Sequence, residues 1–261
     1  LNATRQGPDS APREKTMARI ALVTGGTRGI GRAISLVLKE AGARVAANYA
    51  ANDAAANAFK DETAIEVFKF DVGDFDACKD GISKVEADIG PIDILVNNAG
   101  ITRDKPLHKM DPEHWEAVIA TNLSSAFNTS RNVIDGMRER GFGRIINIGS
   151  INGQKGQFGQ VNYSAAKAGL INLTESVAAE VKEHGIDVNC ICPGATDTEG
   201  FRSAFNHQGR KQDANLMESR EIAELAMFLA SSSASAITGT AIDAFGATNP
   251  IFQSDSRKGK I

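Results

Sequence analysis

The chain has 261 residues, a formal net charge of -3 and a hydrophobic share of 42%. This length suits one large α/β core better than two domains. Neither the charge nor the composition indicates a nucleic-acid or membrane partner. The few cysteines (Cys78, Cys190 and Cys192) and the four histidines lack the spacing of a metal site or a disulfide framework. We therefore expect no metal and reduced core cysteines.

The two ends of the chain differ from its middle. Residues 1–17 are polar and lack the apolar core of a signal peptide, so we expect a disordered leader, native or added. Residues 18–248 are expected to form one domain, followed by a polar tail at 249–261. No apolar run approaches the ~20 residues of a transmembrane helix. We therefore expect a cytoplasmic protein.

Short β-branched or apolar runs alternate with longer helical stretches, which is the pattern of βαβ units. The strand candidates are residues 19–24, 43–49, 65–70, 92–98, 143–150, 186–192 and 239–244. Helices are expected at 29–41, 75–89, 112–140, 161–184 and 219–230, with Asp111 and Pro112 as a helix start. The pattern predicts an α/β fold, a single Rossmann-like, doubly wound domain with a seven-stranded parallel sheet.

A glycine-rich turn follows the first strand and leads directly into a helix. Its residues are Gly25, Gly26, Thr27, Arg28, Gly29, Ile30 and Gly31. Glycines let the main chain approach a pyrophosphate, and the helix N-terminus supplies N–H donors and a favourable dipole. Taken alone, the turn could also be a plain connection without a ligand.

Further motifs follow the later strands in chain order. They are Asp71-Val72, Asn97-Asn98-Ala99-Gly100, Asn122 in the next helix, and Pro193-Gly194 with Thr198 behind it. With the glycine spacing, this set resembles the short-chain dehydrogenase/reductase family over about residues 18–246. The resemblance implies a nicotinamide cofactor bound by Gly25, Thr27, Arg28, Gly29, Ile30, Gly31, Asn48, Asp71, Val72, Asn98, Ala99, Gly100, Tyr163, Lys167, Pro193, Gly194 and Thr198.

The second strand indicates which nicotinamide is bound. An acidic residue after it would accept from the adenosine 2′-hydroxyl and repel a 2′-phosphate. The strand instead ends Asn48-Tyr49-Ala50. Arg28 offers a guanidinium suited to a phosphate, although it could also be a solvated loop arginine. We expect NADP(H) rather than NAD(H).

Tyr163 and Lys167 are four positions apart, so on a helix they share one face. Such a pair is usually a surface pair, but here Ser150 closes the preceding strand. Reducing a ketone requires a proton on oxygen, and a tyrosine with a pKa near 10 needs a nearby ammonium to lower that pKa. Ser150 would bond the substrate oxygen, where negative charge develops. These residues predict an oxidoreductase acting on CH–OH and C=O groups.

The family resemblance extends the catalytic set. It implies that Lys167 also holds the nicotinamide ribose. It implies further that Asn122 is a fourth member, holding a water that connects the lysine to solvent. The alternative for Asn122 is a residue at a helix kink.

The segments around residues 100–109 and 151–162 resemble the branch of the family that reduces acetoacetyl-coenzyme A to the (R)-3-hydroxybutyryl thioester used for polyhydroxybutyrate. This resemblance implies substrate contacts at Asp104, Lys109, Ser150, Gln157, Phe158, Gln160 and Ala195. That branch usually has a tyrosine where this chain has Ala195. Residues 196–220 are a shorter, polar candidate lid.

Two other functions stay open. One is an enzyme of the same mechanism acting on another small ketone, a sugar or a cyclic alcohol. The other is an NADP(H)-binding sensor without catalysis, although such proteins usually lose a catalytic residue. The family also implies a homotetramer formed through the helices at 112–140 and 161–184 and through the last strand.

Overall fold

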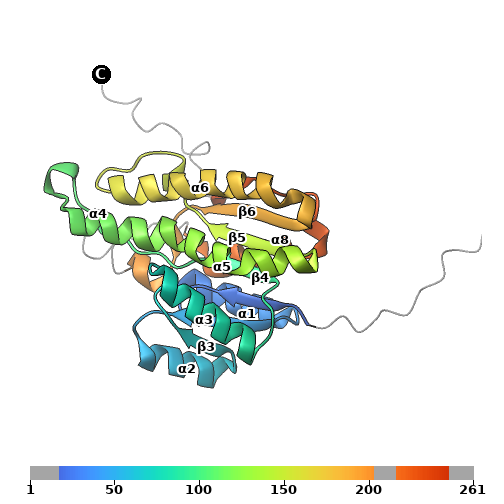
Figure 1. Cartoon of the computed structure of the whole chain (residues 1–261). Coiled ribbons are helices and arrows are strands. Elements are labelled where there is room, and N and C mark those ends of the chain that lie inside the picture. Colours follow the sequence, from blue (N-terminus) through green and yellow to red (C-terminus); the bar gives the residue numbers. More distant parts are fainter. Residues whose placement is uncertain (1–17, 203–215, 247–261) are drawn as a thin grey trace, which may run out of the picture.

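The computed structural model describes residues 18–202 and 216–246, which form one α/β unit around a seven-stranded sheet (Figure 1). The strands run parallel in the order β3-β2-β1-β4-β5-β6-β9. They are β1 (Ile20–Val23), β2 (Arg44–Tyr49), β3 (Glu66–Lys69), β4 (Ile94–Asn97), β5 (Gly143–Ile148), β6 (Ile186–Pro193) and β9 (Ala241–Ala244). The predicted doubly wound fold and all seven predicted strands are confirmed.

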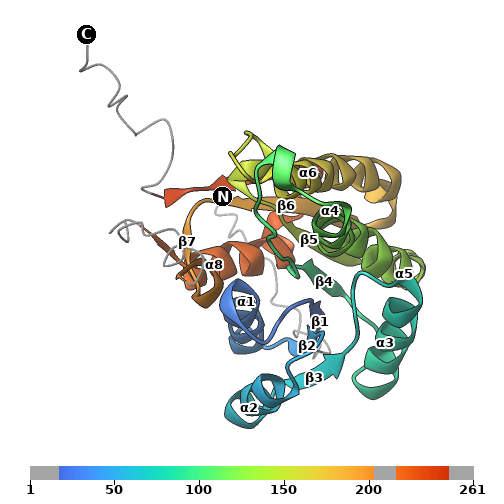
Figure 2. The ribbon, with the colours of Figure 1, turned by 90° about the vertical axis from the view of Figure 1, so that its left-hand side faces the viewer.

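Helices cover both faces of the sheet, and Figure 2 shows the two layers. One face carries α1 (Gly29–Glu40), α2 (Asp53–Thr63) and α8 (Ser219–Ala230); the other carries α3 (Phe75–Asp88), α4 (Pro112–Ile119), α5 (Ser125–Arg140) and α6 (Val161–Val181). Each layer has its own apolar core, one including Ile34, Phe59 and Ile222, the other Ile82, Val133 and Val181. The buried strands therefore read as apolar runs, as expected for a parallel sheet.

Three elements differ from the sequence prediction. Helix α2 was not expected, because its small and polar sequence buries only Ala56 and Phe59. The helix expected over 112–140 contains a π-helical stretch, Ala120–Ser124, between α4 and α5. A two-stranded parallel sheet of β7 (Thr196–Asp197) and β8 (Met217–Glu218) lies beyond β6. Such short pairings carry no recognisable sequence pattern.

Cys190 and Cys192 alternate along β6 with their Sγ atoms 4.0 Å apart, and both are fully buried. The prediction that they share one face as free core cysteines is confirmed. Within residues 18–202 and 216–246, no group of three or more His, Cys, Asp or Glu side chains could hold a metal ion. No helix in the same ranges is long and apolar enough to cross a membrane.

The strand order reverses direction between β1 and β4. In such sheets, ligands bind beyond the carboxyl ends of the strands at this switch point. The glycine-rich turn follows β1, and Asn98 to Gly100 follow β4. Because β1 and β4 are parallel neighbours, both motifs lie at the same edge of the sheet.

Candidate active site

The glycine-rich turn is shaped by close contact between main-chain segments. A Cβ atom on Gly31 would lie 2.2 Å from the main-chain oxygen of Gly25 and 2.4 Å from Nδ2 of Asn98, so no larger residue fits. Gly25 itself has φ +60°, a conformation that favours glycine. The turn thus leads into α1, whose first N–H groups have no partner within the helix. Such a helix N-terminus could hold a pyrophosphate.

Neighbouring strands hold this turn in place. Asn98 donates from Nδ2 to the main-chain oxygens of Thr24 and Gly25 at 2.9 and 3.2 Å. The main-chain N–H of Gly25 donates to Oδ1 of Asn48 at 3.3 Å, and Asn48 donates to the main-chain oxygen of Phe70 at 2.9 Å. Asn48 is buried, and its side chain links the turn to the end of β3.

The end of β2 is where the adenine ribose of a dinucleotide would lie. The first carboxylate after the strand is Asp53, which accepts from Tyr49 Oη at 3.0 Å and from Lys69 Nζ at 2.9 Å. These hydrogen bonds hold the pKa of Asp53 below its usual value. Arg28 is exposed and borders the main pocket. The carboxylate that could bind a 2′-hydroxyl is thus already paired, whereas a guanidinium is accessible.

Ser150, Tyr163 and Lys167 come together as the sequence predicted. Ser150 follows β5, and the other two lie on one face of α6, with Nζ of Lys167 5.7 Å from the centre of the Tyr163 ring. Ser150 forms a side-chain hydrogen bond with Tyr163. Oγ of Ser150 accepts from the main-chain N–H of Asn152 at 3.2 Å, so its own proton is left to donate.

Burial changes the acidity of both α6 side chains. It raises the pKa of Tyr163, while the hydrogen bond from Ser150 lowers it and the charge of Asp104 raises it. Burial lowers the pKa of Lys167 to about 8, and nearby Cys190 and Cys192 act in the opposite direction. A tyrosine that stays protonated beside a buried lysine can serve as a proton donor.

Asn122 lies in the π-helical stretch and fixes the segment after β4. Its Nδ2 donates to the main-chain oxygens of Ile101 and Val118, both at 2.9 Å, and its Oδ1 accepts from the N–H of Ile101 at 3.2 Å. Asn122 is therefore a residue at a helix irregularity that also borders the main pocket.

The main pocket has a volume of about 1000 Å³ and joins the glycine-rich turn to the catalytic residues. Predicted site residues that line it are Arg28, Ile30, Asn98, Gly100, Asp104, Asn122, Ser150, Gln157, Phe158, Gln160, Tyr163, Lys167, Pro193, Gly194 and Thr198. Predicted residues outside its lining are Gly25, Thr27, Gly29, Gly31, Asn48, Asp71, Val72, Ala99, Lys109 and Ala195. Most of the latter support the turn or lie along the adenine side, whereas Lys109 lies on a separate 3₁₀ turn.

Asn152 is a pocket residue that the sequence analysis did not single out. Its Nδ2 donates to Oε1 of Gln160 at 2.7 Å, and Nε2 of Gln160 donates to Oδ2 of Asp104 at 2.7 Å. The signal was present, because a serine often accepts from the N–H two residues later. The partner of its amide could not be read from the sequence.

The candidate lid at 196–220 is described only in part. Residues 203–215 lie outside the described residues. The main-chain N–H of Met217 donates to the oxygen of Ala195 at 3.0 Å, which ties the two described ends together beside β7 and β8. Thr196 and Thr198 thereby reach the pocket.

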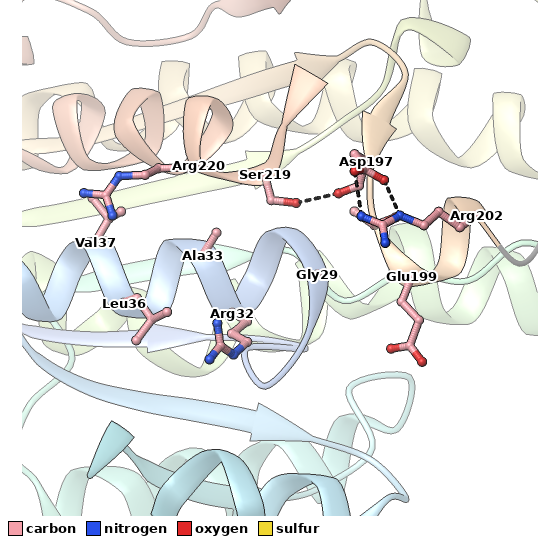
Figure 3. A pocket seen from close by; sticks show the side chains of 11 residues that line it. Gly29, Arg32, Ala33, Leu36, Val37, Asp197, Glu199, Arg202, Ser219 and Arg220 are labelled. Carbon is pink, nitrogen blue, oxygen red and sulfur yellow. Dashed lines mark hydrogen bonds and ion pairs between the residues drawn. The ribbon is translucent and has the colours of Figure 1, made fainter. Parts of the chain in front are cut away.

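A second hollow of about 670 Å³ lies between α1, α8 and the segment after β6 (Figure 3). Its three arginines are engaged: Arg32 with Glu62, Arg202 with Asp197, and Arg220 with Glu40 and Glu224. The Oγ of Ser219 donates to the main-chain oxygen of Asp197. Paired charges of this kind leave no cation among the described lining residues to attract an anion.

Comparisons with known proteins agree with this site. A family profile described as short chain dehydrogenase matches residues 19–209. An acetoacetyl-CoA reductase of Rhizobium meliloti (strain 1021) is 56% identical over 88% of this chain and 98% of its own length. The 3-oxoacyl-[acyl-carrier-protein] reductase FabG of Escherichia coli (strain K12) is 42% identical over 87% of this chain and 96% of its own length.

A solved structure supports the fold. The crystal structure of ribose-5-phosphate isomerase from Brucella melitensis 16M gives a TM-score of 0.82 at 33% identity, covering 87% of this chain and 91% of that one. The similarity extends over most of both chains.

Proposed function

The chain belongs to the short-chain dehydrogenase family and is thus an oxidoreductase acting on CH–OH and C=O groups, and we propose that it reduces acetoacetyl-coenzyme A with NADPH. The observation that carries the proposal is the convergence of Ser150, Tyr163 and Lys167 in a pocket that continues to the glycine-rich turn. Acetoacetyl-CoA reductases from several bacteria share 54–56% of their residues with this chain.

Side chains of this protein bind and protonate the carbonyl oxygen of the substrate. The Ser150 hydroxyl accepts from Asn152, so its proton is available to donate to the carbonyl oxygen, where negative charge develops. Tyr163 donates the proton that completes the alcohol, and the Lys167 ammonium stabilises the phenolate left behind. A nicotinamide cofactor held at the glycine-rich turn would supply the hydride for the carbonyl carbon. Reversal of these steps would oxidise the alcohol.

The residues fit a dinucleotide, and they favour its phosphorylated form. The close approach at Gly31 leaves no room for a side chain, so the turn stays tight at the N-terminus of α1, where a pyrophosphate could bind. Beyond β2, Asp53 is occupied by Lys69 and Tyr49, and Arg28 is exposed at the pocket edge. An exposed guanidinium together with a carboxylate that is already paired favours a 2′-phosphate, and so NADP(H) over NAD(H).

The test is an assay of NADPH oxidation with purified full-length chain. Acetoacetyl-coenzyme A would be compared with a 3-oxoacyl carrier protein and with a panel of uncharged ketones, sugars and cyclic alcohols. We expect the highest kcat/KM with the coenzyme A thioester. Turnover of the small ketones without turnover of the thioester would overturn the substrate assignment, and tight NADPH binding without any turnover would favour the sensor.

The isomerase name of one structural relative does not alter this proposal. Interconverting an aldose and a ketose moves protons and needs no bound nicotinamide. This chain keeps the dinucleotide turn together with Asn122, Ser150, Tyr163 and Lys167. That combination is needed for hydride transfer and is unnecessary for isomerisation.

Assembly as a cytoplasmic homotetramer is part of the proposal. It is supported by exposed apolar side chains on the expected helices, among them Trp115 on α4, Phe127 on α5 and Val161 on α6. Phe127 stacks on Phe75 with ring centres 6.2 Å apart. A second copy would bury these groups. Sedimentation of the full chain should give four times the monomer mass, and a monomer would contradict it.

A further inference from the structure

A chain of hydrogen bonds runs along the pocket rim from the segment after β4 to the catalytic serine. Asp104 accepts from Gln160 at 2.7 Å, Gln160 accepts from Asn152 at 2.7 Å, and the main chain of Asn152 donates to Ser150 at 3.2 Å. The main-chain N–H of Lys105 also donates to the oxygen of Gly159 at 2.8 Å. These bonds join both substrate segments into one rim beside Ser150.

The carboxylate of Asp104 accepts from an amide rather than from a cation on this rim. Its partner is a neutral amide, and the neighbouring Lys105 pairs with Asp111 at 3.3 Å instead. Within residues 18–202 and 216–246, no lysine or arginine forms an ion pair with Asp104. Because Gln160 also bonds Asn152, the amide is held at both ends and fixes the carboxylate.

Several charged groups line the same pocket as Tyr163. Lys167 lies on its own helix, Asp104 on the segment after β4, and Arg28 in the glycine-rich turn. Arg103 and Lys105 also line this space. Of these, only Asp104 is acidic, so it is the one group among them that opposes a phenolate at Tyr163.

Resting on the proposed reductase chemistry, we propose that Asp104 is a positioning residue: Gln160 holds its carboxylate on the pocket rim, where the negative charge favours the proton-donating form of Tyr163 and thereby carbonyl reduction. Contact with the reacting atoms is made by Ser150, Tyr163 and Lys167, not by Asp104. The charge of Asp104 raises the pKa of Tyr163, which is the direction that the proposal requires. Asp104 is exposed, so solvent and salt screen the effect.

The first experiment compares pH profiles of kcat/KM in both reaction directions. Asp104→Asn keeps an oxygen acceptor for Gln160 and removes the charge. Reduction needs protonated Tyr163 and falls as pH rises through its pKa, whereas oxidation needs the phenolate and rises there. We expect the fall of the reduction profile and the rise of the oxidation profile, the two limbs, to move to lower pH by the same amount, up to about 1 pH unit. High salt should shrink the difference from the unaltered protein.

The second experiment titrates Tyr163 without substrate. The chain has only two tyrosines, Tyr49 and Tyr163. In a Tyr49→Phe background the phenolate absorbance therefore reports on Tyr163 alone, and adding Tyr163→Phe supplies the blank. We expect Asp104→Asn to move the absorbance step to lower pH. Because no substrate is present, this result stands even if acetoacetyl-coenzyme A proves not to be turned over.

Two matched variants complete the design. Asp104→Glu keeps the charge, so its limbs should stay near those of the unaltered protein. Glu113→Gln removes a negative charge from the exposed first turn of α4, outside the pocket, and should move neither limb. The proposal is overturned if Asp104→Asn raises KM for the thioester while both limbs and the absorbance step stay in place, because Asp104 would then be a substrate contact only.

Discussion

The ammonium group of Lys167 donates to the main-chain oxygen of Ile148 at 2.6 Å, in a position that is only 4% exposed. Among the described residues no carboxylate pairs with it; the thiols of Cys190 and Cys192 lie near it instead. A buried charge without a counter-ion is costly. The site therefore keeps a destabilising lysine at the position where the proposed mechanism needs a cation.

Replacing this lysine should stabilise the fold while it removes activity. Burial lowers the pKa of Lys167 from 10.5 to about 8. Between pH 8 and pH 10.5 the unfolded chain therefore binds more protons at this lysine than the folded chain does, so the free energy of unfolding rises with pH in that range. At pH 7 the burial of the charge costs about 3 kcal/mol. We expect Lys167→Met to raise the free energy of unfolding at pH 7 by about 1–3 kcal/mol, and by less at pH 10.

Urea denaturation at the two pH values measures this difference. Lys182, which is exposed at the end of α6, offers the matched control, and Lys182→Met should change stability by less than about 0.5 kcal/mol. A Lys167→Met protein that is less stable than the unaltered one at pH 7 would contradict the argument.

Tyr163→Phe keeps the ring and removes the proton that completes the alcohol. We expect kcat for carbonyl reduction to fall by about 10² or more, with cofactor affinity within a few-fold of normal. Steady-state rates and a titration of cofactor binding separate the two effects. Near-normal turnover of this variant would exclude Tyr163 as the acid.

Asn122→Ala removes three hydrogen bonds at once, two to Ile101 and one to Val118. Because Asn122 is buried, these main-chain groups lose their partners, and the free energy of unfolding should fall by about 2–4 kcal/mol. Asn132→Ala breaks a single half-buried bond to Asn128 and should cost about 1 kcal/mol. If thermal unfolding showed equal losses of stability in the two variants, the hydrogen bonds of Asn122 would stabilise the fold no more than the single bond of Asn132.

Gly31→Ala places a methyl group within 2.2 Å of Gly25 and 2.4 Å of Asn98. The turn must shift, so we expect the dissociation constant for NADPH to rise at least about tenfold, a loss of about 1.4 kcal/mol. Gly136→Ala is the control, since in α5 its new methyl lies outside the pocket lining and meets the end of Arg140, which bonds the main-chain oxygen of Ile92. That variant should bind NADPH normally. Calorimetry measures both, and unchanged affinity in Gly31→Ala would rule out the close-approach argument.

Phe158 is 87% exposed on the pocket rim, where a bound acyl chain could cover its ring. We expect Phe158→Ala to raise KM for acetoacetyl-coenzyme A about tenfold with a smaller change in kcat. Leu107 is 74% exposed but outside the pocket lining, and Leu107→Ala should leave KM unchanged. The same KM change in both variants would remove Phe158 from the substrate site.

The sequence predicted the fold well where patterns are local. Apolar runs placed the seven strands, and Asp111 caps α4 as expected by accepting from the N–H of His114 at 2.9 Å. Helix α2 was missed because an amphipathic pattern needs more than the buried pair Ala56 and Phe59. The short β7–β8 pairing was missed because two-residue strands form only where the tertiary fold brings them together.

The sequence by itself determined the placement of Tyr163 and Lys167 on one helix face and of Ser150 at a strand end, because helical spacing and strand ends follow from local periodicity. Only the tertiary structure decided how Asp104, Gln160 and Asn152 link to Ser150. These residues come from separate loops, and their contacts depend on which strands are neighbours. Hydrogen bonds between distant segments leave no period in the sequence, so the rim that surrounds the reaction became visible only in the folded chain.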